Sequence, residues 1–96
     1  MLDVQRTSAF DSCIVDLKDQ RARNRIAGWI LRIRAGLLGD HKSVGGGVSE
    51  IRIDEGPGYR LYFTRRGATV ILLLCGGDKS TQKRDINLAQ TLARSS

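Results

Sequence analysis

The sequence predicts an α+β domain in the order strand, helix, helix, strand, strand, strand, helix, with a mainly antiparallel sheet and the N-terminal helical hairpin packed on it. Three observations support this class. Apolar residues alternate with period two near the start and again in the second half. Between these regions, apolar residues recur at helical spacing. The 96 residues leave room for one hydrophobic core, so one domain is expected over residues 1–96.

The first three elements follow from a change in the apolar period. Leu2–Arg6 alternates as a half-buried strand does. Ser8 and Asp11 have the spacing of a capping box, and the apolar positions behind them predict a helix over Ser8–Lys18. A second apolar stripe predicts a helix over Gln20–Ala35. Because the connection between the two helices is short, they are expected to form an antiparallel hairpin.

The second half of the chain reads as strands separated by turns. Residues 36–47 are polar and glycine-rich, which predicts a mobile loop. Turns are expected at Glu55–Gly58 and at Arg66–Gly67, where Gly and Pro supply the backbone angles that turns need. Ala68–Cys75 is apolar at nearly every position, which is typical of a strand covered on both faces and predicts the centre of the sheet. The remaining elements are expected at Val48–Asp54 and Tyr59–Arg65 (strands) and at Ser80–Arg94 (helix).

The composition indicates that the protein binds a polyanion or an acidic protein. The formal net charge is +6 and the sequence pI is about 10.0. The longest apolar run is far shorter than a membrane span, and residues 1–11 contain no secretory signal pattern, so we expect a cytoplasmic protein that does not enter a membrane. Cys13 and Cys75 belong to no metal-binding pattern and are expected to be small buried hydrophobes. Neither a metal nor a cofactor is expected.

Basic residues are concentrated between Lys18 and Lys42, where seven Lys and Arg accompany Asp19 and Asp40. Long basic side chains often line an exposed helix face, which is one interpretation. The other is a docking stripe for RNA or for an acidic segment of a partner protein. The sequence leaves both open.

A second basic group is expected on the sheet. If the strands around Glu55–Gly58 form a hairpin, Arg52 and Arg60 project from one polar face with Tyr62 beside them, and Lys79 follows the neighbouring strand. Like charges on adjacent strands repel one another, but guanidinium groups can clamp a phosphate between them. The alternative is that these cations pair with nearby carboxylates, for which the candidates are Glu50, Asp54 and Asp78.

Such a group has the parts that RNA cleavage needs when a 2′-OH attacks the adjacent phosphate. Arginine stays protonated, so Arg52 and Arg60 are expected to stabilise charge. Lys79 is the better candidate for proton transfer, either as the acid or, with a lowered pKa, as the base. The single histidine, His41, excludes a mechanism with paired histidines, although it could serve alone as base or acid. No Gly-Lys-Ser/Thr follows the triple glycine, so nucleotide hydrolysis lacks support.

Three sequence blocks, Gly47–Asp54, Gly56–Phe63 and Leu72–Ser80, together resemble the addiction-module killer proteins, a HigB-like branch of the RelE/ParE toxin superfamily. The resemblance covers the whole chain. It implies the toxin of a bacterial type II toxin–antitoxin pair, an mRNA endoribonuclease that acts on the ribosome. It also implies a helix-turn-helix antitoxin as partner. The toxin would contact operator DNA only through this antitoxin.

The resemblance also implies a site. Arg52, Arg60 and Lys79 stand at or near positions where ribonuclease members carry catalytic basic residues, whereas Glu50 replaces a basic residue found in some ribosome-dependent members. Gyrase-poisoning members share the fold without the nuclease site, so a ParE-like gyrase-binding toxin is the alternative function. The side chains expected to bind RNA are His41, Lys42, Tyr62, Lys83 and Arg84.

Overall fold

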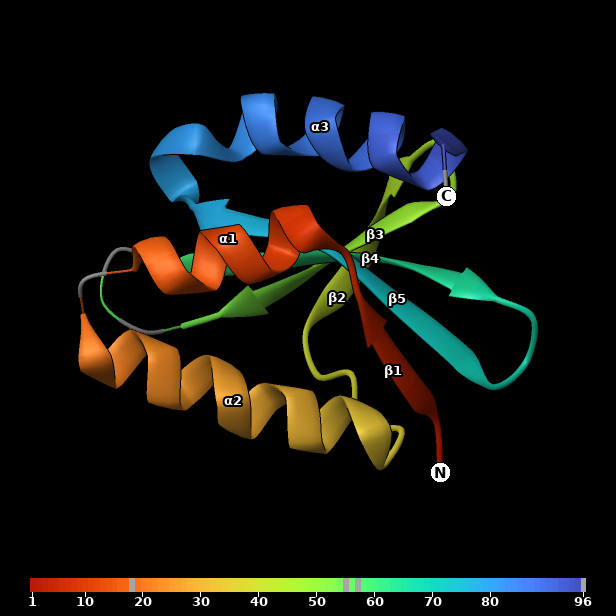
Figure 1. The fold of residues 1–96 in the computed structure, drawn as a ribbon, viewed down its shortest axis with the longest axis horizontal. Helices are drawn as coiled ribbons and strands as arrows, with labels where there is room; N and C mark the ends of the chain where they lie inside the picture. Colours follow the sequence, from red (N-terminus) through yellow and green to blue (C-terminus); the bar gives the residue numbers. More distant parts are fainter. Residues whose placement is uncertain (18, 55, 57, 96) are drawn as a thin grey trace.

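The computed structural model describes residues 1–17, 19–54, 56 and 58–95. Within these ranges the chain forms one α+β domain with a mixed five-stranded sheet and three α-helices, which confirms the predicted class (Figure 1). The elements are β1 (Asp3–Arg6), α1 (Ser8–Asp16), α2 (Gln20–Arg34), β2 (His41–Gly45), β3 (Val48–Ile53), β4 (Tyr59–Arg66), β5 (Val70–Asp78), the 3₁₀ turn η1 (Lys79–Thr81) and α3 (Gln82–Ser95).

The sheet has the strand order β1-β5-β4-β3-β2. Only the β1–β5 pair is parallel among the described strands, so the prediction of a mainly antiparallel sheet is confirmed. The central strand is β4, however, and the expectation that Ala68–Cys75 occupies the centre was wrong. β5 nevertheless lies between two neighbours and contacts α1 and α3, which accounts for its apolar sequence.

The segment predicted as a mobile loop contains a strand. β2 pairs with β3 through His41↔Ile51, Lys42↔Glu50 and Ser43↔Ser49. This edge strand is mostly exposed and has no apolar alternation, so it lacks the side-chain pattern by which strands are recognised. The triple glycine forms the turn of the β2–β3 hairpin, where Gly45, Gly46 and Gly47 all have positive φ.

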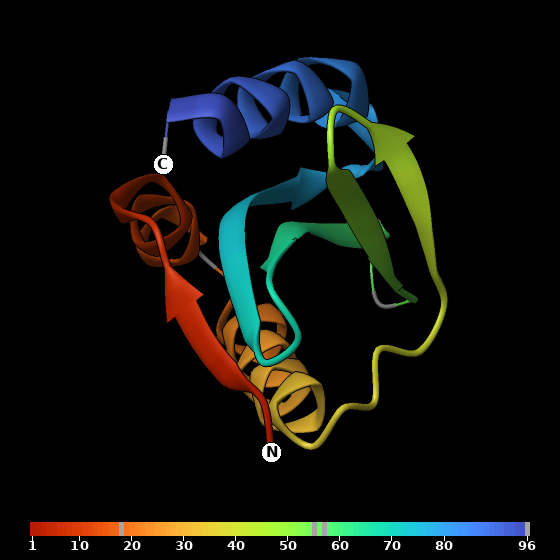
Figure 2. The same cartoon turned by 90° about the vertical axis from the view of Figure 1, so that its right-hand side faces the viewer.

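Helices cover both faces of the sheet, with α2 on one side and α3 on the other (Figure 2). One core lies on the α1–α2 side and includes Phe10, Ile33, Leu61 and Phe63. The second core lies under α3 and is formed by the buried residues Val48, Tyr62, Leu74, Cys75 and Ala89. The expected polar face of β4, with Arg60, Tyr62 and Thr64, is therefore buried rather than exposed, because α3 packs over it.

The helix boundaries differ slightly from the prediction. The N-cap of α1 is Thr7 rather than Ser8, and the Thr7 Oγ1 atom accepts a 3.0 Å hydrogen bond from the Phe10 amide. Asp19 caps α2 in the same way through the Arg21 amide. The two helices run in opposite directions, as expected for a helical hairpin (Figure 1). The predicted end of the first helix at Lys18, and Glu55 and Pro57 of the predicted turn, lie outside the described residues.

Gly77 on β5 lies where a larger residue has no room. A Cβ atom there would collide with the Asp85 carboxylate and would lie 2.8 Å from the Thr81 hydroxyl oxygen. We expect Gly77→Ala to lower the free energy of unfolding by about 1–3 kcal/mol, because the start of α3 must move away from the sheet. Urea denaturation measures this change.

Gly28→Ala on α2 is the matched control, because nothing lies within 4 Å of the added Cβ. This substitution should stabilise the protein by up to about 1 kcal/mol through helix propensity. Equal effects of the two substitutions would show that β5 and α3 do not pack as closely as described.

Candidate functional site: a basic pocket beside β3 and β4

The register of β3 and β4 places Arg52 directly opposite Arg60, so the predicted adjacency of the two arginines is confirmed. Their environments differ. Arg60 is 6% exposed, and its Nη1 atom lies 2.6 Å from Oε1 of Glu50. The Arg52 side chain is 51% exposed and lies 3.8 Å from the Asp40 carboxylate. Pairing with Glu50, the alternative considered for these cations, therefore applies to Arg60.

The Glu50–Arg60 pair is part of a buried polar network beneath α3. Glu50 is completely buried, and its second carboxylate oxygen accepts a 2.8 Å hydrogen bond from the Gln82 side chain at the start of α3. Arg60 Nε and the Tyr62 hydroxyl have no hydrogen-bond partner among the described residues. Burial, with further contributions from Glu50 and Asp85, raises the pKa of Tyr62 well above its usual value, so the phenol stays protonated.

All three predicted catalytic residues line one surface pocket of about 620 Å³ next to Gly56 and Gly58. Arg52 and Arg60 reach it from β3 and β4. Lys79 reaches it from η1, which begins where β5 ends. The pocket also contains side chains that the sequence did not assign to a site: Trp29, Asp40, Ile53, Asp54 and Tyr59. Cations and carboxylates therefore share a single pocket, an arrangement that can bind a phosphate and exchange a proton with groups attached to it.

The turn that holds Lys79 is stabilised by its neighbour Asp78. The Asp78 carboxylate accepts hydrogen bonds from the Ser80 amide at 2.8 Å and from the Ser80 hydroxyl at 2.5 Å. The bond from the Ser80 side chain is the main reason why the pKa of Asp78 lies below its usual value. Asp78 therefore caps η1 while charged and fixes the backbone from which Lys79 projects.

The residues predicted to bind RNA lie apart from this pocket. His41 lines a separate hollow with Leu38 and Phe63, and its Nδ1 atom lies 2.9 Å from the Gly39 carbonyl oxygen, to which it can donate. Lys42 is exposed on the edge strand β2. Lys83 and Arg84 lie on the first turn of α3 beside a third hollow.

Tyr62 is fully buried under α3, where no ligand on the surface of this structure reaches it. The sequence suggested that Tyr62 is exposed, because the alternating residues of β4 resemble those of a strand in a sheet with one solvent-exposed face.

Asp40 and Trp29 are the main additions to the site. Asp40 lay in the segment predicted as a loop, and it enters the pocket because β2 pairs with β3 and the Arg52 amide donates a 3.0 Å hydrogen bond to the Asp40 carbonyl. Trp29 belongs to the apolar stripe of α2, a pattern that indicates the core and gives no sign of a second role. Neither residue carried a sequence signal for function.

The described residues form neither a metal-binding cluster nor a helix that could span a membrane. They contain no group of three or more His, Cys, Asp and Glu side chains that could hold a metal ion. None of the described helices is long and apolar enough to cross a membrane.

Comparison with known proteins places the chain in a family. Residues 18–94 match the model of the family described as phage derived protein Gp49-like, and the chain belongs to that family. A protein of Haemophilus influenzae named only as uncharacterized is 46% identical over 93 residues, which are 97% of this chain and 94% of the relative. The family is toxin-like and related to the RelE type.

The Glu50–Arg60 pair gives a prediction for stability. Glu50→Ala should lower the free energy of unfolding by about 3–5 kcal/mol, because it leaves the buried Arg60 guanidinium without its counter-ion. Urea denaturation measures the loss. Adding Arg60→Met to Glu50→Ala should restore part of the stability, since the uncompensated charge is then removed. A double variant that is as unstable as the sum of the two single variants would contradict this coupling.

Asp78 gives a prediction for the dependence of stability on pH. A carboxyl whose pKa is lower in the folded state stabilises the fold above its unfolded pKa, near 3.8, and this contribution is lost as pH falls through the folded value. Asp78→Ala should therefore destabilise by about 0.5 kcal/mol at pH 7 and by less at pH 2. Asp78→Asn keeps a capping oxygen, so it should match the wild type more closely at pH 7. Thermal denaturation at the two pH values separates these cases.

Proposed function

We propose that this member of the Gp49-like family is the toxin of a type II toxin–antitoxin pair, a HigB-like relative of the RelE/ParE superfamily that cleaves mRNA on the ribosome. A helix-turn-helix antitoxin would neutralise it, and the toxin would meet operator DNA only through that antitoxin. The cytoplasm, where mRNA is translated, is its proposed location. The observation that carries the proposal is the pocket that Arg52, Arg60 and Lys79 share. Membership of a toxin-like family is in keeping with it.

In the proposed reaction, the 2′-oxygen of the RNA attacks the adjacent phosphorus while the bond from phosphorus to the 5′-oxygen breaks. The exposed cations Arg52 and Lys79 stabilise the charge that accumulates on the phosphate oxygens. The carboxylates of Asp40 and Asp54 line the same pocket, and one of them accepts the 2′-OH proton. Lys79 donates a proton to the departing 5′-oxygen. The products are a 2′,3′-cyclic phosphate and a 5′-OH.

Arg60 contributes differently from Arg52 in this proposal. Its charge is already balanced by Glu50, and little of its surface is exposed. It therefore acts mainly as a positioning residue that holds β4 and the neighbouring pocket wall in place.

Substitution of the exposed basic residues by alanine tests the proposal. We expect Lys79→Ala and Arg52→Ala each to reduce mRNA cleavage about 10²–10³-fold, as the loss of one preorganised donor typically does. The measurement is primer extension on transcripts after induction, together with translation arrest. Neither substitution should greatly affect stability, because both side chains are solvent-accessible.

Arg94→Ala is the matched control, since it removes the same charge from the exposed end of α3, away from the pocket. Full toxicity and unchanged cut sites in both the Lys79 and the Arg52 variant would show that the pocket is not the active site. Intact mRNA with a DNA-damage response would instead support the gyrase-binding function. Harmless expression without an antitoxin would exclude a toxin of either kind.

A further inference from the structure

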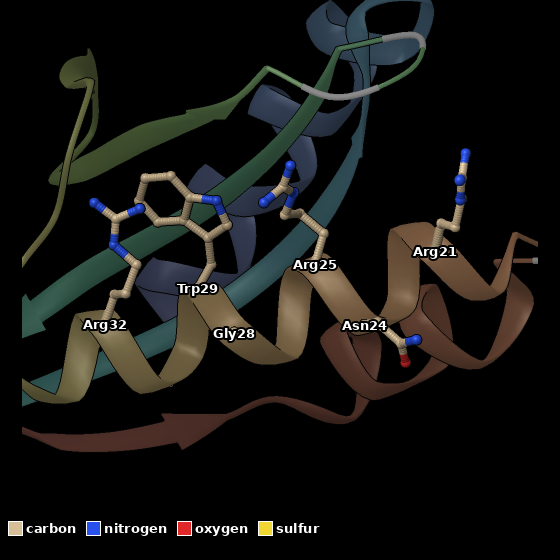
Figure 3. Close-up of a pocket in the computed structure, with 6 residues that line it drawn as sticks. All are labelled: Arg21, Asn24, Arg25, Gly28, Trp29 and Arg32. Carbon is tan, nitrogen blue, oxygen red and sulfur yellow. The ribbon is translucent and has the colours of Figure 1, made fainter.

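A second basic surface lies on α2, outside the proposed cleavage pocket. Figure 3 shows this surface, and we call it the α2 face: a hollow of about 600 Å³ lined by Arg21, Asn24, Arg25, Gly28, Trp29 and Arg32. The guanidinium of Arg32 lies over the Trp29 ring, 4.3 Å from the ring centroid. Absence of a side chain at Gly28 keeps the floor of the hollow open, since nothing lies within 4 Å of the Cβ position.

The charge of α2 is larger than its fold requires. The helix carries five arginines and no acidic residue. Arg32 and Arg34 in the last turn interact favourably with the helix dipole, but Arg21 in the first turn opposes it. Repulsion among like charges on one helix is also unfavourable. A polyanion on this face would offset both costs.

Trp29 connects the α2 face to the cleavage pocket, because it lines both hollows. Its ring is held against Gly39, where an added Cβ would lie 2.5 Å from the ring atom Cη2. The indole is therefore a fixed aromatic surface between a row of arginines and the cations Arg52 and Lys79. Basic grooves with interleaved aromatic side chains are the usual binding surface for single-stranded nucleic acids.

We propose that the α2 face binds the single-stranded RNA next to the cleaved bond, with Arg21 and Arg32 on phosphates and a nucleobase stacked on Trp29. The identity of the ligand as RNA rests on the proposed function. Stacking of a base on an indole is stronger than an exposed cation–π contact. The arriving base therefore displaces the Arg32 guanidinium, which then pairs with a neighbouring phosphate. An acidic peptide would use the arginines, but it would leave the fixed indole without a role.

The single tryptophan of the chain provides a direct test. Purified protein is titrated with a fluorescently labelled 2′-O-methyl oligoribonucleotide, which lacks the attacking 2′-OH and cannot be cut. We expect quenching of Trp29 emission, and anisotropy should report binding that weakens as salt rises. Trp29→Leu should weaken binding roughly 5- to 150-fold, as expected for loss of one base–aromatic stack. Trp29→Phe keeps an aromatic ring and should restore part of the affinity.

The exposed variants Arg21→Ala and Arg32→Ala keep the test valid if Trp29→Leu fails to fold. Each should weaken binding and reduce the slope of log affinity against log salt by about 0.7. Arg94→Ala is the charge-matched control on α3, on the opposite side of the sheet, and it should change neither quantity (Figure 2).

The outcomes separate this inference from the proposed function. Binding that quenches Trp29 and depends on Arg21 and Arg32 supports the inference even if no transcript is cut in cells. Cleavage that depends on Arg52 and Lys79, without quenching and without an effect of the α2 variants on binding, overturns the inference and leaves the proposed function standing. Preferential binding of a polyglutamate peptide to the α2 face also overturns it and assigns the face to a protein partner.

Discussion

The buried ion pair between Arg60 and Glu50 joins β4 to β3, and the Gln82 side chain links this pair to the C-terminal helix. Removing a carboxylate and a guanidinium from water is costly, and their attraction repays this cost only when the remaining polar atoms also find partners. Gln82 meets part of that need, because its amide donates to the second oxygen of Glu50. The first turn of α3 is thereby attached to β3 and β4, and the close approach at Gly77 is possible only because that residue has no side chain.

The same pair keeps Arg60 away from solvent. Arg60 is neutralised within the protein, so the solvent-exposed cations of the pocket are Arg52, which lies 3.8 Å from the Asp40 carboxylate, and Lys79. Lys79 stands at the junction between β5 and α3, which the Glu50–Gln82 hydrogen bond and the Asp78 cap both stabilise. The stability of the fold and the geometry of the proposed site therefore depend on the same few contacts.

Much of the fold could be predicted because strong apolar periods mark its elements. The positions of β1, β3 and β4 followed from a period of two residues, and those of α1, α2 and α3 followed from a period near 3.6. The position of β5 followed from its continuous apolar run. β2 could not be found in this way, because an exposed edge strand is held by backbone hydrogen bonds that leave no pattern in its side chains. The pairing of β3 with β4 places Arg52 opposite Arg60, so the sequence could predict that the two arginines lie side by side. Of these two arginines only Arg52 is exposed, because α3 packs over Arg60, and this packing could not be predicted from the sequence. Asp40 and Trp29 joined the pocket through contacts between distant segments, which no local pattern encodes.

The net charge of +6 does not act as one uniform field. Five arginines on α2 create an attraction that depends on salt and is indifferent to sequence. In the proposed reaction, the cations of the pocket would act over a few ångströms on a single phosphate, together with carboxylates that α2 lacks. Trp29 lies at the boundary, and its ring can orient a base where phosphates alone would allow the strand to slide. In the proposed function, binding and reaction use different residues, so substitutions on α2 and in the pocket should affect affinity and rate separately.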